Sequence, residues 1–358
     1  MRITIDATSV LLRSAGVKNY TYHWIRHLRR LAQGDEILAF PCLGDLGRLE
    51  HDTSVLPLWR TVPRIALLHG VNVLGWRVLE TVLARSDIFH ASNLVHRAPR
   101  SGRLTATLHD FTCWLMPQFH TPANVRADRN FAERILARAD GMIAVSENTR
   151  QDAVRLLNLP PEKIETIHSG VATEYFDAKA ARRDRPYVLC VGTIEPRKNL
   201  DTLLDAWRLL KPGLRHEFEL VIAGPVGWSA TATVARIRVE ATWLGYVPET
   251  DLPSLVAGAT VFVYPSLYEG FGFPVAQAMA AGVAVLTSNN SCLPEIAGDG
   301  ALLVDPRSAA EIAAGLTRLL ESKSLRKEVA ARGRRRAERY RWEACAARSL
   351  EFFRRVAA

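Results

Sequence analysis

Residues 266–295 read SLYEGFGFPVAQAMAAGVAVLTSNNSCLPE, and this stretch decides the fold class. The apolar, β-branched residues 259–264 before it predict a strand, and the Gly-rich turn after that strand carries Glu269. A helical segment and a second apolar run at 283–287 follow, so the order is strand, turn, helix, strand. Because ligands bind beyond the carboxyl ends of parallel strands, we expect Glu269 and the amides of residues 270–273 to face a ligand.

The same alternation of strands and helices extends over the whole chain. Strands are predicted at residues 2–6, 88–91, 104–108, 164–167, 187–191 and 219–223. Helices are predicted at residues 200–210, 252–257, 309–321 and 325–339. This order predicts an α/β fold with parallel sheets covered on both faces.

The chain has 358 residues, which is longer than most domains with a single hydrophobic core, so two domains are expected. Residues 1–183 are predicted to form the first Rossmann-like domain, with a charged linker at 179–185. Residues 184–340 are predicted to form the second, and residues 341–358 a final amphipathic helix.

Composition favours a soluble protein of a reducing compartment. The chain begins directly with a strand-like segment, and its apolar runs are too short to span a bilayer. Its five cysteines are odd in number, scattered and without metal-ligand spacing, which predicts reduced thiols in a cytoplasmic protein. They are Cys42, Cys113, Cys190, Cys292 and Cys345.

The net charge of +9 is spread unevenly. Residues 323–358 carry twelve basic and four acidic side chains, and the first half of the chain is also basic. Such surfaces can bind anionic lipid, nucleic acid or an acidic acceptor, or can simply be solvated helix faces. Because no nucleic-acid-binding motif accompanies the basic residues, we expect no nucleic-acid partner and at most a peripheral contact with an anionic membrane.

The loop after the strand at 187–191 reads GTIEPRKN, from Gly192 to Asn199. Arg197 and Lys198 are adjacent cations at a strand-to-helix turn, where they can bind two phosphates. We expect this turn to be exposed, so that replacing both residues affects activity more than folding. No Asp-x-Asp triplet occurs that could hold a divalent metal, so these two cations are the candidates for stabilising a negatively charged group.

Together these segments resemble the retaining glycosyltransferases of family 4, which have the GT-B architecture of two facing Rossmann-like domains. The resemblance covers nearly the whole chain and is strongest from 187 to 305. It implies that the last helix returns to the first domain. It also implies that a second carboxylate, eight positions after Glu269, binds the nucleotide ribose, and here that position is Gln277.

The resemblance implies a set of site residues. The catalytic residues would be His109, at the end of a strand, with Glu269, Arg197 and Lys198. Glu269 would bind sugar hydroxyls, although a carboxylate there could instead cap the next helix. The donor would be bound by Gly16, Gly192, Arg197, Lys198, Gly270, Phe271, Gly272 and Gln277. In the family, the turn before Gly16 often has a second glycine, whereas this chain has Ala15.

The leading interpretation is a retaining, metal-independent hexosyltransferase of cell-surface polysaccharide synthesis. Residues 87–90 and 109–110 most resemble mannosyltransferases, so GDP-mannose is the first expected donor and a UDP-hexose the second. The acceptor would be a glycan or a lipid-linked acceptor, and the protein would be cytoplasmic or peripheral on the inner face of the membrane. Two alternatives stay open: an inactive nucleotide-sugar-binding protein, suggested by Gln277 and Ala15, and a sugar-nucleotide epimerase.

Overall fold

The computed structural model describes residues 1–12, 16–41, 43–75, 86–92, 94–95, 97, 99 and 102–358. The chain divides into two compact units, one formed by residues 1–170 with 342–358 and the other by residues 171–341. Each unit contains a six-stranded sheet in which every pairing is parallel. The predicted α/β fold with two parallel sheets is therefore confirmed.

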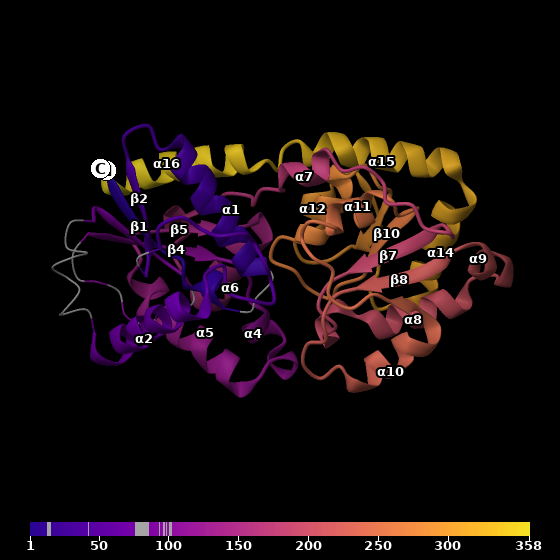
Figure 1. Cartoon of the computed structure of the whole chain (residues 1–358), viewed down its shortest axis with the longest axis horizontal. Helices are drawn as coiled ribbons and strands as arrows, with labels where there is room; N and C mark the ends of the chain where they lie inside the picture. The colour runs from indigo at the N-terminus through magenta and orange to yellow at the C-terminus, as the bar shows by residue number, and fades with distance from the viewer. Residues whose placement is uncertain are drawn as a thin grey trace. The chain divides into compact units, whose positions relative to one another are not determined.

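The sheet of the first unit has the order β2-β1-β3-β4-β5-β6. Its strands are β1 (Arg2–Asp6), β2 (Glu36–Phe40), β3 (Ile88–Ala91), β4 (Arg103–Leu108), β5 (Gly141–Ala144) and β6 (Ile164–Thr166). The helices of this unit are α1 (Gly16–Leu31), α2 (Leu58–Leu74), α4 (Thr112–Leu115), α5 (Pro122–Arg134), α6 (Glu147–Leu157) and α16 (Trp342–Ala357). In Figure 1, α16 lies above this sheet, and α2 and α5 lie below it.

The sheet of the second unit has the order β12-β11-β10-β7-β8-β9. Its strands are β7 (Tyr187–Val191), β8 (Glu219–Ala223), β9 (Thr242–Trp243), β10 (Val261–Tyr264), β11 (Val285–Ser288) and β12 (Ala301–Val304). Its helices are α7 (Thr173–Phe176), α8 (Leu200–Leu209), α9 (Pro212–Glu217), α10 (Thr231–Glu240), α11 (Leu252–Ala257), α12 (Phe273–Ala280), α13 (Leu293–Ala297), α14 (Ala309–Glu321) and α15 (Lys323–Ala337). Helices α11 and α12 lie on one side of β7 and β10, and α8 and α10 lie on the other (Figure 1).

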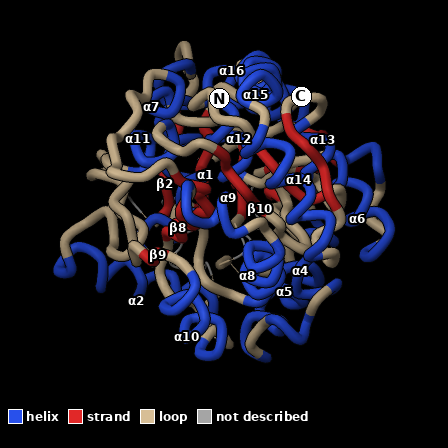
Figure 2. The backbone as a smooth tube through the Cα atoms, turned by 90° about the vertical axis from the view of Figure 1, so that its right-hand side faces the viewer, coloured by secondary structure: helices blue, strands red, loops and turns tan. Residues whose placement is uncertain are grey.

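The strands are apolar because they are covered by helices on both faces. In β10, all four residues of VFVY are buried, and Figure 2 shows the strands enclosed by helices and loops. The four cysteines within the described residues, Cys113, Cys190, Cys292 and Cys345, are buried thiols that form no disulfide, as expected for core thiols.

The last helix belongs to the first unit, as the resemblance implied. Its apolar stripe packs on α1, where the Trp24 indole N–H donates a hydrogen bond of 2.9 Å to the Ser349 hydroxyl. The rings of Trp24 and Phe353 lie 5.9 Å apart, and Trp342 is also buried.

The chain passes between units at Gly170–Val171, earlier than the boundary placed at 183 from the sequence. The linker segment is part of the second unit because Tyr175 and Phe176 of α7 are buried there. The Ala181 N–H also donates to the Ser254 carbonyl at 2.9 Å.

Candidate active site

Strand order predicts a ligand site at the carboxyl ends of β7 and β10. These strands are neighbours in the sheet, but the chain runs outward from them in opposite directions, to β8 and β9 from β7 and to β11 and β12 from β10. Loops that leave the carboxyl ends of such a pair diverge and leave room for a ligand. The two loops here are residues 192–199 and 265–272.

The loop after β7 is held in place by main-chain hydrogen bonds and by a close approach of two backbone segments. The Gly192 N–H donates to the Ala223 carbonyl at 2.9 Å, and the Ile194 N–H donates to the Pro225 carbonyl at 2.9 Å. A Cβ atom at Gly224 would lie 2.0 Å from the Gly192 carbonyl oxygen, so the close approach of the two loops requires glycine there. The short 3₁₀ turn η5 (Pro196–Lys198) then presents both cations from a fixed backbone.

Hydrogen bonds tie this loop to the one after β10. Asn199, in the left-handed conformation, donates from its side-chain amide to the Pro265 carbonyl at 3.1 Å. The Leu267 N–H donates to the Arg197 carbonyl at 2.9 Å. The loop after β11 joins them, since the Ser288 hydroxyl donates to the Ser266 carbonyl at 2.7 Å. Three strand-end loops therefore form one hydrogen-bonded unit.

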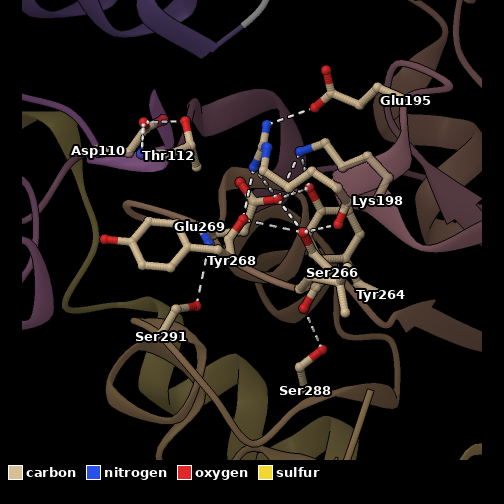
Figure 3. A network of polar contacts seen from close by, with 12 residues as sticks. Asp110, Thr112, Glu195, Lys198, Tyr264, Ser266, Tyr268, Glu269, Ser288 and Ser291 are labelled. Atoms are coloured by element: carbon tan, nitrogen blue, oxygen red, sulfur yellow. Dashed lines mark hydrogen bonds and ion pairs between the residues drawn. The ribbon is translucent and has the colours of Figure 1, made fainter. Parts of the chain in front are cut away.

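The Glu269 carboxylate is the centre of this unit (Figure 3). Its Oε1 atom lies 2.7 Å from Lys198 Nζ and 2.8 Å from Arg197 Nη1. It also accepts hydrogen bonds of 2.6 Å from the Ser266 hydroxyl and 2.9 Å from the Tyr264 hydroxyl. One carboxylate oxygen is thus surrounded by two cations and two hydroxyl groups.

The charges of this cluster compensate one another. Burial alone would raise the pKa of Glu269, but the Arg197 and Lys198 cations, with hydrogen bonds from Lys198 and Ser266, lower it to about 2. Arg197 has a second carboxylate partner in Glu195, at 2.7 Å from Nη2. Both cations are therefore already paired with carboxylates, and a diphosphate would have to compete with Glu195 and Glu269 for them.

One expectation about these residues is wrong, and one alternative is excluded. The side chains of Arg197 and Lys198 are only 14% and 12% exposed, because they neutralise a buried carboxylate instead of extending from an exposed turn. Glu269 does not cap α12, since the N-cap of that helix is Gly272 and no side chain caps it. Replacing the two cations will consequently affect folding as well as chemistry.

The glycines around Glu269 shape the turn before α12. Gly272 has a φ of +81°, and a Cβ atom there would lie 2.7 Å from Leu293 Cδ2, so both its conformation and its surroundings favour glycine. Phe271 is buried, with its ring 5.1 Å from that of Phe273 and 5.6 Å from that of Tyr340. Its side chain belongs to the core, so only its backbone is a candidate for ligand contact. Gln277 lies half-buried in the second turn of α12.

Two other predicted site residues, Gly16 and His109, belong to the first unit. Gly16 is the exposed first residue of α1, and Ala15 lies outside the described residues. His109 directly follows β4, with its ring 4.9 Å from that of Tyr20 in an edge-on contact. Burial lowers the pKa of His109 to about 4, so it is neutral at pH 7 and can exchange hydrogen bonds without carrying charge. The neighbouring His90 is buried between Thr105 and Thr107 and serves the core.

His109 makes a pH prediction possible. Between pH 6.5 and about 4, the unfolded chain binds a proton at this position that the folded chain does not, so folding stability falls as the pH drops through that window. In His109→Gln, folding stability should fall less steeply over this window, by up to about 1.4 kcal/mol per pH unit, because glutamine does not bind a proton. Denaturant unfolding of both proteins at several pH values measures the difference, and parallel curves would show that His109 is protonated in the folded state.

Several residues of the cluster were missed from the sequence: Glu195, Tyr264, Ser266 and Ser291. The Ser291 hydroxyl accepts a hydrogen bond of 3.1 Å from the Glu269 N–H. Their shared signal is position, because each lies at or just beyond the carboxyl end of β7, β10 or β11. Within the described residues, no group of three or more His, Cys, Asp or Glu side chains is arranged to hold a metal ion.

Comparison with known proteins agrees with this geometry. Residues 171–336 match the model of the family described as "Glycosyl transferases group 1", and residues 14–175 match the model "Glycosyltransferase Family 4". The chain is 34% identical over 284 residues to O-antigen chain mannosyltransferase B of Escherichia coli, an alignment that covers 75% of this chain and 74% of that protein. The chain belongs to glycosyltransferase family 4.

Other relatives and solved structures extend this result. The glycosyltransferase is 30% identical over 233 residues to MMP alpha-(1->4)-mannosyltransferase of Mycolicibacterium hassiacum, covering 63% of this chain and 56% of that protein. Sucrose-phosphate synthase from Thermosynechococcus elongatus superposes with a TM-score of 0.75 at 20% identity, covering 99% of this chain and 98% of that one. Anabaena HepE, solved in complex with UDP, superposes with a TM-score of 0.70 at 15% identity, covering 98% of each chain. These structures confirm the GT-B fold.

Proposed function

We propose that this glycosyltransferase transfers a hexose, with mannose favoured, from a nucleoside diphosphate sugar to a glycan or lipid-linked acceptor in cell-surface polysaccharide synthesis. The observation that carries the proposal is the pairing of Arg197 and Lys198 with Glu269 at the strand-order switch of the second unit. Cations suited to a diphosphate and a carboxylate suited to sugar hydroxyls occupy the same place. The mannosyltransferase names of two relatives support mannose as the sugar and GDP-mannose as the first donor, ahead of a UDP-hexose.

In this proposal, contacts with the donor replace the ion pairs within the cluster. The diphosphate oxygens compete with Glu269 for the Arg197 guanidinium and the Lys198 ammonium group. Sugar hydroxyls then donate to the Glu269 oxygen that the cations release. Diphosphate binding would therefore prepare Glu269 to bind the sugar, because it frees the carboxylate oxygen to which the sugar hydroxyls donate.

The chemical step breaks the bond between the anomeric carbon and the diphosphate oxygen and forms a bond between that carbon and an acceptor hydroxyl oxygen, whose proton passes to the departing diphosphate. The electron pair of the broken bond moves to the diphosphate oxygen, where Arg197 and Lys198 stabilise the developing negative charge. In metal-dependent enzymes a bound divalent metal stabilises such a charge. In this protein the two fixed cations would do so, and we therefore propose a metal-independent reaction. Family membership supports retention of the donor's anomeric configuration.

Gln277 supplies the main argument for a protein with weak or lost activity. An amide has one acceptor oxygen where a carboxylate has two, so Gln277 would bind ribose hydroxyls less strongly than a glutamate. A nucleotide-sugar-binding protein would bind donors and never release the diphosphate, whereas an epimerase would change the sugar without any acceptor. A thermal-shift screen of sugar nucleotides, followed by product analysis with and without acceptor, separates these three activities.

The role of Gln277 leads to a direct prediction. If this side chain contacts the ribose, Gln277→Glu should tighten nucleotide binding by about 1.5–3 kcal/mol, because hydrogen bonds to a charged acceptor are stronger. Titration calorimetry with GDP and UDP measures the change. Gln118→Glu, an exposed substitution in the first unit, is the matched control and should leave the affinity unaltered. Unchanged or weaker binding in Gln277→Glu would mean that the ribose is held by other residues.

A further inference from the structure

A second buried carboxylate, Glu195, lies beside the cations of the cluster. It is 5% exposed, and its Oε1 atom accepts a hydrogen bond of 2.7 Å from Arg197 Nη2. Although Glu195 is the N-cap residue of η5, its side chain makes no capping hydrogen bond there. Burying a carboxylate is costly, and a loop that only binds anions gains nothing from one. The charge of Glu195 must therefore act on the guanidinium beside it.

Glu195 and Glu269 contact different nitrogen atoms of Arg197. Glu269 lies 2.8 Å from Nη1 and also 2.7 Å from Lys198 Nζ, whereas Glu195 lies 2.7 Å from Nη2. In Figure 3, Glu195 is at the edge of the network, away from Glu269. A diphosphate that takes the place of Glu269 on Nη1 and Nζ would therefore leave the contact between Glu195 and Nη2 intact.

The backbone around Glu195 is fixed on both sides. The Ile194 N–H donates to the Pro225 carbonyl at 2.9 Å, and the Gly227 N–H donates to the Ile194 carbonyl at 3.0 Å. A Cβ atom at Gly227 would lie 2.9 Å from the Ile194 carbonyl oxygen, so the loop after β8 packs directly on this segment. On the other side, the Lys198 N–H donates to the Glu195 carbonyl at 3.0 Å. Glu195 is thus held in place while the partners of the cations change.

The formal charges of the cluster cancel, since Arg197 and Lys198 are matched by Glu195 and Glu269. A sugar nucleotide carries one negative charge on each of its two phosphate groups. Once the sugar has been transferred, the terminal phosphate gains a second ionisation with a pKa of about 6, so the released diphosphate carries more charge than the donor at pH 7–8. A cluster without the charge of Glu195 would be positive and would bind the product more strongly than the donor.

We propose that Glu195 makes the site discriminate against the released nucleoside diphosphate, so that the product leaves and a new donor binds. Glu195 is a positioning residue that acts through Arg197. It orients the guanidinium toward the loop after β10 and offsets one of the two positive charges. This inference rests on the proposed function, because it takes the ligand to be a nucleoside diphosphate sugar.

Titration calorimetry of the full chain at pH 8 tests the proposal, with GDP and with GDP-mannose in the absence of acceptor. Glu195→Gln keeps an acceptor oxygen for Arg197 Nη2 but removes the charge. GDP should bind this variant at least about tenfold more tightly than wild type, and the ratio of the GDP affinity to the GDP-mannose affinity should rise at least about threefold. UDP and UDP-glucose form the equivalent pair of probes.

Glu219→Gln is the matched control. Glu219 pairs with Arg183 at 2.9 Å in the same unit, at the amino end of β8, whereas the cluster lies at the carboxyl ends of the strands. This substitution removes the same charge and should alter each affinity by less than about twofold. Equal effects of Glu195→Gln and Glu219→Gln would overturn the proposal, as would a gain in Glu195→Gln that is the same for GDP and GDP-mannose.

A second measurement uses the wild-type protein and needs no folded variant. From pH 5 to pH 8 the terminal phosphate of GDP loses its second proton, whereas GDP-mannose has no such group. Because the wild-type cluster has no net charge, the ratio of the two affinities should change by less than about twofold over this range. A rise above about threefold in favour of GDP would overturn the role of Glu195. Failure of the wild-type protein to bind any of the four nucleotides would instead overturn the proposed function, and this inference with it.

Discussion

The double substitution Arg197→Ala/Lys198→Ala is expected to slow glycosyl transfer by at least about 10²–10³-fold, the effect of losing one well-placed stabilising group. Both cations contact the same buried Glu269 oxygen, so they are positioned to act together on a diphosphate. The variant should also lose about 3–5 kcal/mol of folding stability, because the buried Glu269 charge keeps its hydroxyl donors but loses both cationic partners. Rates must therefore be measured well below its melting temperature and corrected for the folded fraction.

A matched pair controls for loss of positive charge. Arg208 and Lys211 are exposed cations of the same unit that pair with Glu240 and Glu321, and Arg208→Ala/Lys211→Ala should keep the wild-type rate. Adding EDTA to the wild-type enzyme should leave its rate nearly intact if fixed cations replace a metal. Full activity in the folded Arg197→Ala/Lys198→Ala variant would contradict the proposed role of this cluster, as would a loss of activity in EDTA that added metal restores.

Glu269→Gln, which keeps the shape of the side chain but removes its charge, should lower both folding stability and transfer activity. At pH 7 it removes the charge that holds Arg197 and Lys198, at an expected cost of about 3 kcal/mol of folding stability. The lowered pKa of about 2 means that wild-type Glu269 contributes fully above pH 4.5 and loses its contribution as the pH falls from 4.5 to 2. The two proteins should therefore approach each other in stability as the pH is lowered through that window.

Denaturant unfolding over this pH range provides the measurement. The exposed Glu321→Gln, which breaks a surface ion pair with Lys211, should cost no more than about 1 kcal/mol. Transfer by Glu269→Gln, assayed under conditions where it is folded, should fall because the amide is a weaker acceptor for sugar hydroxyls. Equal stability of wild type and Glu269→Gln at pH 7 would mean that the three charges do not stabilise one another.

Much of the fold could be predicted because its strands are buried on both faces. The bounds of β1, β3, β7, β8, α11 and α14 agree with those predicted from the sequence. The strands β2 and β12 were not predicted. They are edge strands, and β12 has a half-exposed sequence, ALLV, that lacks the long apolar run of a central strand.

Helix α2 was missed for a different physical reason. Sequence patterns locate a helix by contrast between an apolar and a polar side, and α2 is apolar on both. Pro63 lies inside the helix and further obscures it. The lack of a continuous polar side therefore concealed α2 in the sequence.

The sequence pointed to three charged residues of the candidate site, but it did not show that they form ion pairs with one another. Arg197, Lys198 and Glu269 stand out in the sequence because each follows a predicted strand. Their direct contact depends on β7 and β10 being neighbours in the sheet, although Lys198 and Glu269 are 71 positions apart in the chain. Local patterns do not encode that pairing, so the cations were expected on an exposed turn instead of against a buried carboxylate.

The most direct test of the proposed transferase follows the anomeric proton of GDP-mannose by NMR, with purified enzyme and a mannan acceptor. The proposal predicts release of GDP together with a new α-mannoside, the configuration of the donor, and no such product when acceptor is omitted. The same experiment with UDP-hexoses decides the donor. A change of the sugar without acceptor would identify an epimerase, and binding of donors without any release of nucleoside diphosphate would contradict the proposed transferase activity.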